Sequence, residues 1–173
     1  MLVYMAKPQK SPRKSNVDAA PHELDPALLI EVCAQLLAIR TLDRLVTAGC
    51  VGLRYSDGFV FQHLVPGPLP VTELAKRLQM TQQGASKAVV DLERRGYVER
   101  VQAPNDERVR LVTLTDLGWM AVNGARQARD ELKKELRTML GVSGEEQFSN
   151  SLRTLTQALG GFEMLRERRL LPR

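Results

Sequence analysis

Long apolar runs are absent from this 173-residue sequence, and roughly 18 or more consecutive apolar residues would be needed for a membrane span. A membrane partner is therefore not expected. The N-terminus carries charge but no apolar stretch follows it, so we also predict no secretory signal and expect a cytoplasmic protein.

Cysteine and histidine are scarce, at two residues each. Cys33 and Cys50 lack the spacing of a metal or redox motif, and no acidic or cysteine cluster accompanies His63, so no metal site or cofactor is predicted. The sequence also lacks a glycine-rich phosphate loop, a nucleophile elbow and paired carboxylates in an apolar setting. These absences argue against an enzyme.

Positive charge is concentrated at the N-terminus. The formal net charge is +5, but residues 1–16 hold four basic residues and no acidic one, which leaves +1 for the remaining chain. Residues 1–24 are rich in Pro, Ser and Lys without apolar periodicity, which predicts a disordered basic tail. An arm that clamps phosphate is the alternative. Nucleic-acid binding by the rest must be argued from where its charges lie.

The first ordered segment is predicted at residues 25–50. Asp25 precedes Pro26 as an N-cap residue, and apolar residues then recur at helical spacing until Gly49. Residues 51–64 are less regular, although Phe59, Phe61 and Leu64 suggest a short second helix before the proline-rich break at 66–70.

Residues 70–114 have the order of a winged helix-turn-helix. Pro70 opens a short helix, and Thr81 can cap a second one that Gly96 ends. The inward positions of the second helix are Ala85, Ala88, Val89 and Leu92. Two β-prone runs follow, at 97–101 and 109–114, joined by a turn at 104–106. Two tandem helices followed by a β-hairpin define the winged motif.

Two further helices are predicted after the hairpin. Thr115 caps a helix that runs to Leu140, Gly141 ends it, and Ser143 with Glu146 forms a capping box for the last helix. Its apolar residues are spaced by four and three: Phe148, Leu152, Leu155, Leu159 and Phe162. We therefore expect a mainly α fold with a small β-hairpin wing. Residues 25–50 and 115–170 form a helical dimerisation lobe, and residues 51–114 form a DNA-binding lobe.

The second helix of the motif presents a mixed polar face. Glutamine can pair with adenine, lysine reaches guanine or phosphate, and serine contacts a base or the backbone. At the hairpin tip, Arg108 is placed to enter the minor groove, and Asp106 is predicted to hold it by a charge-assisted hydrogen bond. The predicted DNA contacts are Thr81, Gln82, Gln83, Ser86, Lys87, Arg94, Arg108 and Arg110. The alternatives are a solvated helix face and a surface ion pair.

These segments together resemble one known family. The residues Val71–Leu78, Thr81–Arg100, Asp106–Arg108 and Leu114–Gly118 are similar to the MarR family over about residues 69–120. The resemblance implies a homodimer with its recognition helices in the major groove and Arg108 in the minor groove. It also implies repression relieved by a small, often aromatic, anionic ligand bound between the lobes. The segments at 55–58 and 66–70 depart from the family pattern.

A ligand pocket is predicted where the long helix meets the winged lobe. Its candidate residues are Arg40, Tyr55, Phe59, His63 and Trp119, with core packing, or a surface salt bridge for Arg40, as the alternative. Cys33 lies among apolar neighbours, which favours a buried, inert thiol with a raised pKa over an oxidant sensor.

The predicted function is a sequence-specific transcription regulator, a repressor that a small molecule releases from a pseudo-palindromic operator. Two alternatives stay open: a winged-helix module that binds protein, and a thiol-sensing regulator that uses Cys33.

Overall fold

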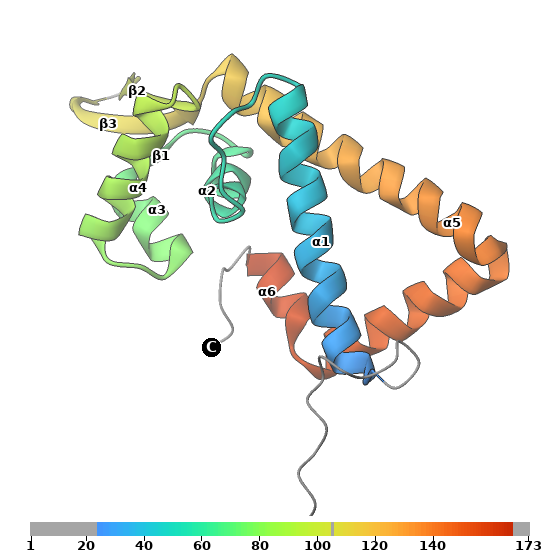
Figure 1. Ribbon diagram of the computed structural model, residues 1–173. Helices are drawn as coiled ribbons and strands as arrows, with labels where there is room; N and C mark the ends of the chain where they lie inside the picture. Colours follow the sequence, from blue (N-terminus) through green and yellow to red (C-terminus); the bar gives the residue numbers. More distant parts are fainter. Residues whose placement is uncertain (1–23, 105, 168–173) are drawn as a thin grey trace, which may run out of the picture. The chain divides into compact units, whose positions relative to one another are not determined.

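The computed structural model describes residues 24–104 and 106–167, so the predicted tail lies almost wholly outside the described residues. Contacts divide the chain into one unit up to Ala38 and another from Ile39. The elements are α1 (Pro26–Thr47), α2 (Asp57–Leu64), β1 (Leu69–Pro70), α3 (Val71–Leu78), α4 (Gln82–Arg94), β2 (Val98–Ala103), β3 (Asp106–Leu114), α5 (Asp116–Ala158) and α6 (Gly161–Glu167) (Figure 1). The predicted mainly α fold with a winged hairpin is confirmed.

Helix α1 has the predicted ends. The backbone N–H of Leu28 donates to Asp25 Oδ1 at 2.9 Å, which is the expected N-cap. At the other end Gly49 has a φ of 92°, and the N–H of Cys50 donates to the carbonyl of Leu45 at 2.8 Å. Glycine suits this left-handed position because it has no Cβ to clash with the backbone.

The tandem helices α3 and α4 pack side by side (Figure 1). Thr81 caps α4 as predicted, since its hydroxyl oxygen accepts the N–H of Gly84 at 3.1 Å. Gly96 follows α4 with a φ of 80°, and the N–H of Tyr97 returns to the carbonyl of Leu92. These turns direct the chain from the second helix into the wing.

The wing is a three-stranded antiparallel sheet in the order β1-β3-β2. Strand β1 pairs Leu69 with Val112 and Pro70 with Leu111. The sequence predicted a hairpin of two strands and missed β1, because a two-residue strand has no periodicity and proline lowers strand propensity.

The hydrophobic core lies within the winged lobe, and most helices and strands of the lobe contribute at least one buried side chain to it. Its largest fully buried members are Tyr97, Leu64, Leu74, Leu92, Val89, Val98, Val112 and Cys50. Helix α2, the predicted short second helix, contributes Val60, Phe61 and Leu64 to this core. At Gly118 in α5 an added Cβ would lie 2.2 Å from the carbonyl oxygen of Tyr97, so α5 and the start of the sheet meet backbone to backbone.

Helix α5 begins as predicted but differs further along. Thr115 accepts the N–H of Gly118 at 3.1 Å as its N-cap, and the helical geometry breaks at Gly141, with φ 71° and ψ 173°. Within the described residues Ser143 and Glu146 form no hydrogen bond to each other, so the predicted capping box is wrong. The helix resumes directly after Gly141, which leaves Ser143 inside it.

The last apolar seam is divided between two helices. Gly160, with a φ of 71°, separates α5 from α6, so Phe162 lies on α6 and not on the helix of the other four seam residues. The prediction of one continuous helix overlooked the Gly160–Gly161 pair, which favours a break. Among residues 24–104 and 106–167, no helix is both long enough and apolar enough to cross a bilayer.

Candidate nucleic-acid interface

The outward face of α4 carries the polar residues that the sequence predicted. Ala85, Val89 and Leu92 are buried, which turns Gln83, Lys87 and Arg94 to solvent. Thr81 and Gln82 are exposed at the start of the helix, and Ser86 is half-buried beside them. Val90 is 50% exposed on the same face. The face therefore combines amides, a hydroxyl, one apolar side chain and two cations.

Ion pairs separate the cations of this lobe into two groups. Arg94 donates to Asp91 at 2.8 Å, Arg77 to Glu73 at 2.9 Å, and Arg100 lies 3.3 Å from Glu93. In contrast, no ion pair is formed within the described part of the chain by Lys87, Arg108 or Arg110. These three cations, two of them on the wing, are available to an anionic partner.

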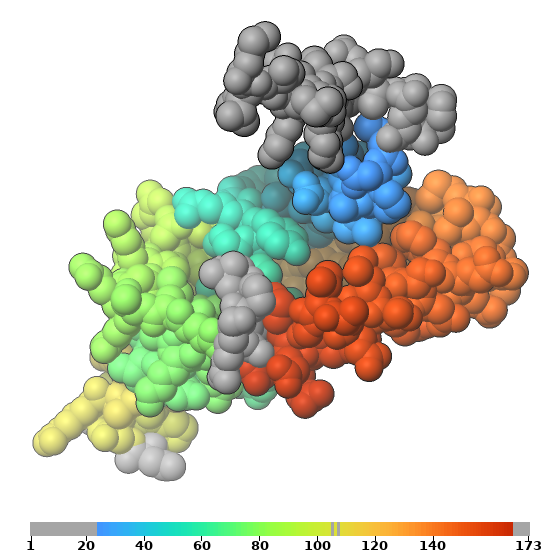
Figure 2. Space-filling view, turned by 90° about the horizontal axis from the view of Figure 1, so that it is seen from below, coloured from blue at the N-terminus to red at the C-terminus, as the bar shows by residue number. Residues whose placement is uncertain are grey.

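The wing places its arginines on an exposed hairpin that projects from the lobe (Figure 2). Arg108 and Arg110 are both exposed on β3. Asp106 Oδ1 accepts the backbone N–H of Arg108 at 2.9 Å, and among the described residues it forms no ion pair with the guanidinium. The predicted hydrogen bond between Asp106 and Arg108 is therefore present, and the backbone N–H of Arg108 is its donor. An Asp side chain commonly bonds to the backbone two residues on, which stabilises the turn and leaves the arginine head free.

A cluster at the C-terminal end of α4, missed by the sequence analysis, joins the helix to the turn after α1. We name it the Arg95 cluster: Arg95, Asp57, Asp91, Tyr97 and the carbonyls of Val51 and Gly52. Arg95 Nη1 donates to Asp57 Oδ2 and to the carbonyl of Gly52, both at 2.8 Å, and Nη2 donates to Asp91 Oδ2 at 2.9 Å. The i,i+4 spacing of Asp91 and Arg95 was a detectable signal; Asp57 offered none.

The Arg95 cluster shifts the proton affinity of its members. The hydrogen bond from Arg94, helped by the charges of Arg95 and Arg54, holds the pKa of Asp91 below its ordinary value. The hydrogen bond to Asp57 raises the pKa of Arg95 further. Arg95 is therefore a permanent cation, held in place by the two aspartates that accept its hydrogen bonds.

The residues predicted to line a ligand pocket have different environments. Tyr55 and Phe59 contact each other edge to face, with ring centroids 5.8 Å apart. His63 is only 3% exposed and belongs to the buried set, whereas Trp119 is 37% exposed. Arg40 pairs with Glu135 on α5 at 2.9 Å, which is the surface salt bridge given above as its alternative use.

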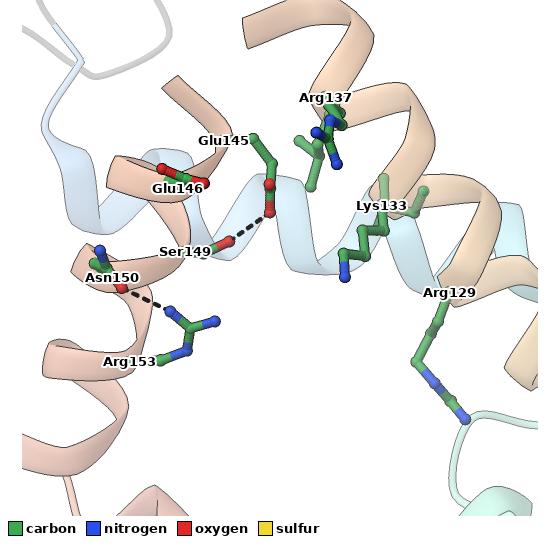
Figure 3. Close-up of a pocket in the computed structure, with 10 residues that line it drawn as sticks. Arg129, Lys133, Arg137, Glu145, Glu146, Ser149, Asn150 and Arg153 are labelled. Carbon is green, nitrogen blue, oxygen red and sulfur yellow. Dashed lines mark hydrogen bonds between the residues drawn. The ribbon is translucent and has the colours of Figure 1, made fainter. Parts of the chain in front are cut away.

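A cleft of about 740 Å³ lies instead along α5, on both sides of Gly141 (Figure 3). Arg129, Lys133 and Arg137 come from the arm before the break, and Arg153 from the arm after it. Their spacing of four places three cations in one row, without an ion pair among the described residues. The remaining lining residues are Leu132, Leu136, Glu145, Glu146, Ser149 and Asn150.

The two cysteines differ in exposure. Cys33 is exposed, so its predicted burial is wrong, while Cys50 is buried and has a raised pKa because of that burial. Apolar neighbours along α1 do not bury Cys33, because Val32 and Leu36 are themselves 43% and 55% exposed. Within the described residues, no group of three or more His, Cys, Asp or Glu is arranged to hold a metal.

Two tandem helices, α3 and the capped α4, followed by a three-stranded wing define a winged helix-turn-helix fold. Residues 60–109 match the family model described as "MarR family". YdgJ of Bacillus subtilis, named an uncharacterized HTH-type transcriptional regulator, is 29% identical over 75 residues. That match covers 43% of this chain and 44% of YdgJ, so the similarity spans less than half of this curated relative.

Solved structures extend the likeness in fold. The complex of Staphylococcus aureus MepR with DNA has a TM-score of 0.64 at 22% identity, over 78% of this chain and 97% of that one. YusO of Bacillus subtilis has a TM-score of 0.62 at 22% identity, over 76% and 92% of the two chains. These likenesses give the chain a winged helix-turn-helix fold, and within it residues 60–109 are similar to the MarR family.

Proposed function

We propose that this protein is a transcription regulator that binds a pseudo-palindromic operator through α4 and the wing. The observation that carries the proposal is the exposed face of α4, where glutamines lie beside Lys87, which forms no ion pair among the described residues. Amides can distinguish base edges, whereas a purely charged face would contact phosphates alone. The named DNA complex of MepR, a protein of similar fold, supports the same use of this lobe.

The ion pairs refine which cations contact DNA. We expect Lys87, Arg108 and Arg110 to contribute more than Arg94, because Arg94 already donates to Asp91. Arg108 is suited to the minor groove, where the negative potential is strongest, and the Asp106 contact fixes its backbone there.

The test begins with selection of duplexes from a random library, followed by fluorescence anisotropy on the selected and a shuffled duplex across a salt series. Arg108→Ala should weaken binding to both and reduce the slope of log K against log salt by about 0.9, because one cation that neutralises phosphate charge from the minor groove is lost. Gln83→Ala should instead relax discrimination, by roughly 1–3 kcal/mol at one base pair. Lys134→Ala on α5 removes one positive charge outside the lobe and controls for net charge.

Two results would overturn this proposal. Equal losses on selected and shuffled DNA in Gln83→Ala would remove the base contact from α4. No binding to any duplex at low salt would favour the protein-binding alternative, in which the polar face of α4 meets another chain.

The operator proposal includes a homodimer. Phe148, Leu152 and Leu155 of α5 and Leu159, its C-cap residue, are 41%, 37%, 39% and 71% exposed, at four- and three-residue spacing. A second copy would cover this seam and place two winged lobes on one duplex, with half-sites about one helical turn apart.

We further propose that a small organic anion weakens operator binding. Two sites can be compared: the predicted pocket around Arg40, Tyr55 and Trp119, and the cleft of α5, whose row of cations at four-residue spacing forms no ion pair among the described residues. Like charges at this spacing repel one another, and a bound anion would relieve that repulsion.

Benzoate, an aromatic monoanion, and sulfate serve as probes in calorimetry and in release from the selected duplex. If Lys133→Ala abolishes benzoate binding and Trp119→Ala does not, the anion binds in the cleft. If only Trp119→Ala abolishes it, the anion binds in the predicted pocket. Binding of neither probe, together with undiminished DNA affinity, would contradict anion control.

A further inference from the structure

The Arg95 cluster contains the closest hydrogen bonds between α4 and the segment that precedes α2. Arg95 donates from a single guanidinium to two carboxylates and to two carbonyls, those of Gly52 and Asp91, and its side chain is 15% exposed against 10% for Asp57. The guanidinium spreads its donors over three nitrogens in a fixed plane and so spans acceptors from separate segments, whereas the three donors of an ammonium group share one nitrogen. A side chain this covered is poorly placed to contact a phosphate itself.

A second residue holds the same turn. The hydroxyl of Tyr97 donates to the carbonyl of Val51 at 2.8 Å, and the Arg95 guanidinium carbon lies 5.9 Å from the centroid of the Tyr97 ring. Asp57 Oδ2 also accepts the N–H of Arg54 at 2.8 Å. Arg95 and Tyr97, which follow α4, therefore donate hydrogen bonds to two consecutive carbonyls of the turn. Arg95 also donates to Asp57, the first residue of α2.

The other side of this turn is the end of α1, which is tied to α5. Arg44 pairs with Glu131 and, at 3.3 Å, with Glu135. Leu45 is buried, and an added Cβ at Gly124 of α5 would lie 2.7 Å from its Cδ2. From Ile39 onward, α1 therefore links α5 to the turn that the Arg95 cluster holds.

We propose that Arg95 is a positioning residue that fixes the recognition helix relative to α1 and α5 and so sets the half-site spacing that the protein accepts. This inference rests on the proposed operator binding. If the dimer is formed through α5, the angle between α4 and α5 determines how far apart the two recognition helices lie. A looser connection lets each lobe adjust by itself, and the preference for one spacing falls.

The experiment uses the full chain and a series of selected duplexes whose half-sites are moved apart or together by one or two base pairs. Arg95→Lys keeps the charge but loses the forked contacts. We expect it to bind the preferred spacing about tenfold more weakly and the shifted spacings nearly as well as the wild type. The salt slope should stay unchanged, because no phosphate contact is removed.

A second variant acts from the other side of the cluster. Asp57→Asn lies on α2, outside the face of α4, and should also flatten the spacing preference. Arg77→Lys is the matched control: it weakens an arginine ion pair on α3 and should keep the wild-type preference. The thermal unfolding midpoint of each variant is measured first, and binding is then measured below the lowest midpoint, so that every variant is folded.

Three results would overturn the inference. A wild-type spacing preference in both Arg95→Lys and Asp57→Asn would show that the cluster only stabilises the fold. A salt slope reduced by about one in Arg95→Lys would make it a direct phosphate contact. Absence of any DNA selection by the wild type would be the failure of the proposed function itself, and the inference would fall with it.

Discussion

At the scale of single residues, Cys33 and Cys50 show how little neighbours in the sequence say about burial. Cys33 has apolar neighbours but is exposed, whereas Cys50 follows a glycine turn and is fully buried within the core. An apolar helix face indicates that the helix packs against another surface, but the sequence does not tell whether that surface belongs to the same chain or to a partner. The position of Cys50 depends on the turn that returns the chain from α1 to the core.

We predict that iodoacetamide at pH 8 alkylates Cys33 well before Cys50 in the native protein. Thiolate is the reactive form, and burial both raises the pKa of Cys50 and blocks access to it. Mass spectrometry of peptides should locate the first adduct at Cys33, with Cys50 modified only after denaturation. Rapid native alkylation of Cys50 would contradict its buried position; Cys33→Ser provides the control that isolates it.

At the scale of elements, the helical glycines Gly58 and Gly118 differ in the space available for an added side chain. At Gly118 the first turn of α5 approaches the backbone of Tyr97, whereas an added Cβ at Gly58 of α2 meets nothing within 4 Å. Both lie in helices, where alanine is otherwise preferred over glycine. Packing should therefore decide the sign of an alanine substitution.

We predict that Gly118→Ala lowers the free energy of unfolding by about 2 kcal/mol or more, because backbone must move to admit the methyl group. Gly58→Ala should raise it by about 0.5–1 kcal/mol. Urea denaturation followed by circular dichroism measures both. A neutral Gly118→Ala would mean that α5 and the sheet do not touch as described.

Capped and periodic elements were the predictable part of this fold. Thr81 and Thr115 each precede a helix with clear apolar periodicity, so their caps and the stripe of α4 could be inferred directly. Strand β1 could not, since its two residues form a strand only by pairing with β3. Likewise, Asp57 and Arg95 are 38 positions apart, and no local pattern connects them.

At the scale of the whole molecule, the apolar seam of α5 calls for a partner. Exposed leucines at regular helical spacing cost free energy in water, at roughly 25 cal/mol per Å² left uncovered. The second copy that we propose would bury them, and the operator would then be bound by two lobes at once.

We predict that the wild type is a dimer at micromolar concentration and that Leu152→Glu with Leu155→Glu yields a folded monomer. Light scattering after gel filtration measures the mass, and circular dichroism confirms the helices. Gln147→Glu adds a negative charge at an exposed polar position of the same helix and should stay dimeric. A monomeric wild type, or a dimeric double variant, would place the interface elsewhere.

The short strand β1 has a consequence for how the protein behaves when crowded. Of the two outer strands of the sheet, β1 has only two residues, and Pro70 has no N–H to offer a passing chain. The other outer strand, β2, carries the exposed charged side chain of Glu99. Unpaired strand edges are the usual starting points of intermolecular β-aggregation. Both edges of this wing are poor templates, so the arginine-bearing hairpin can stand out into solvent without recruiting its own copies into fibrils.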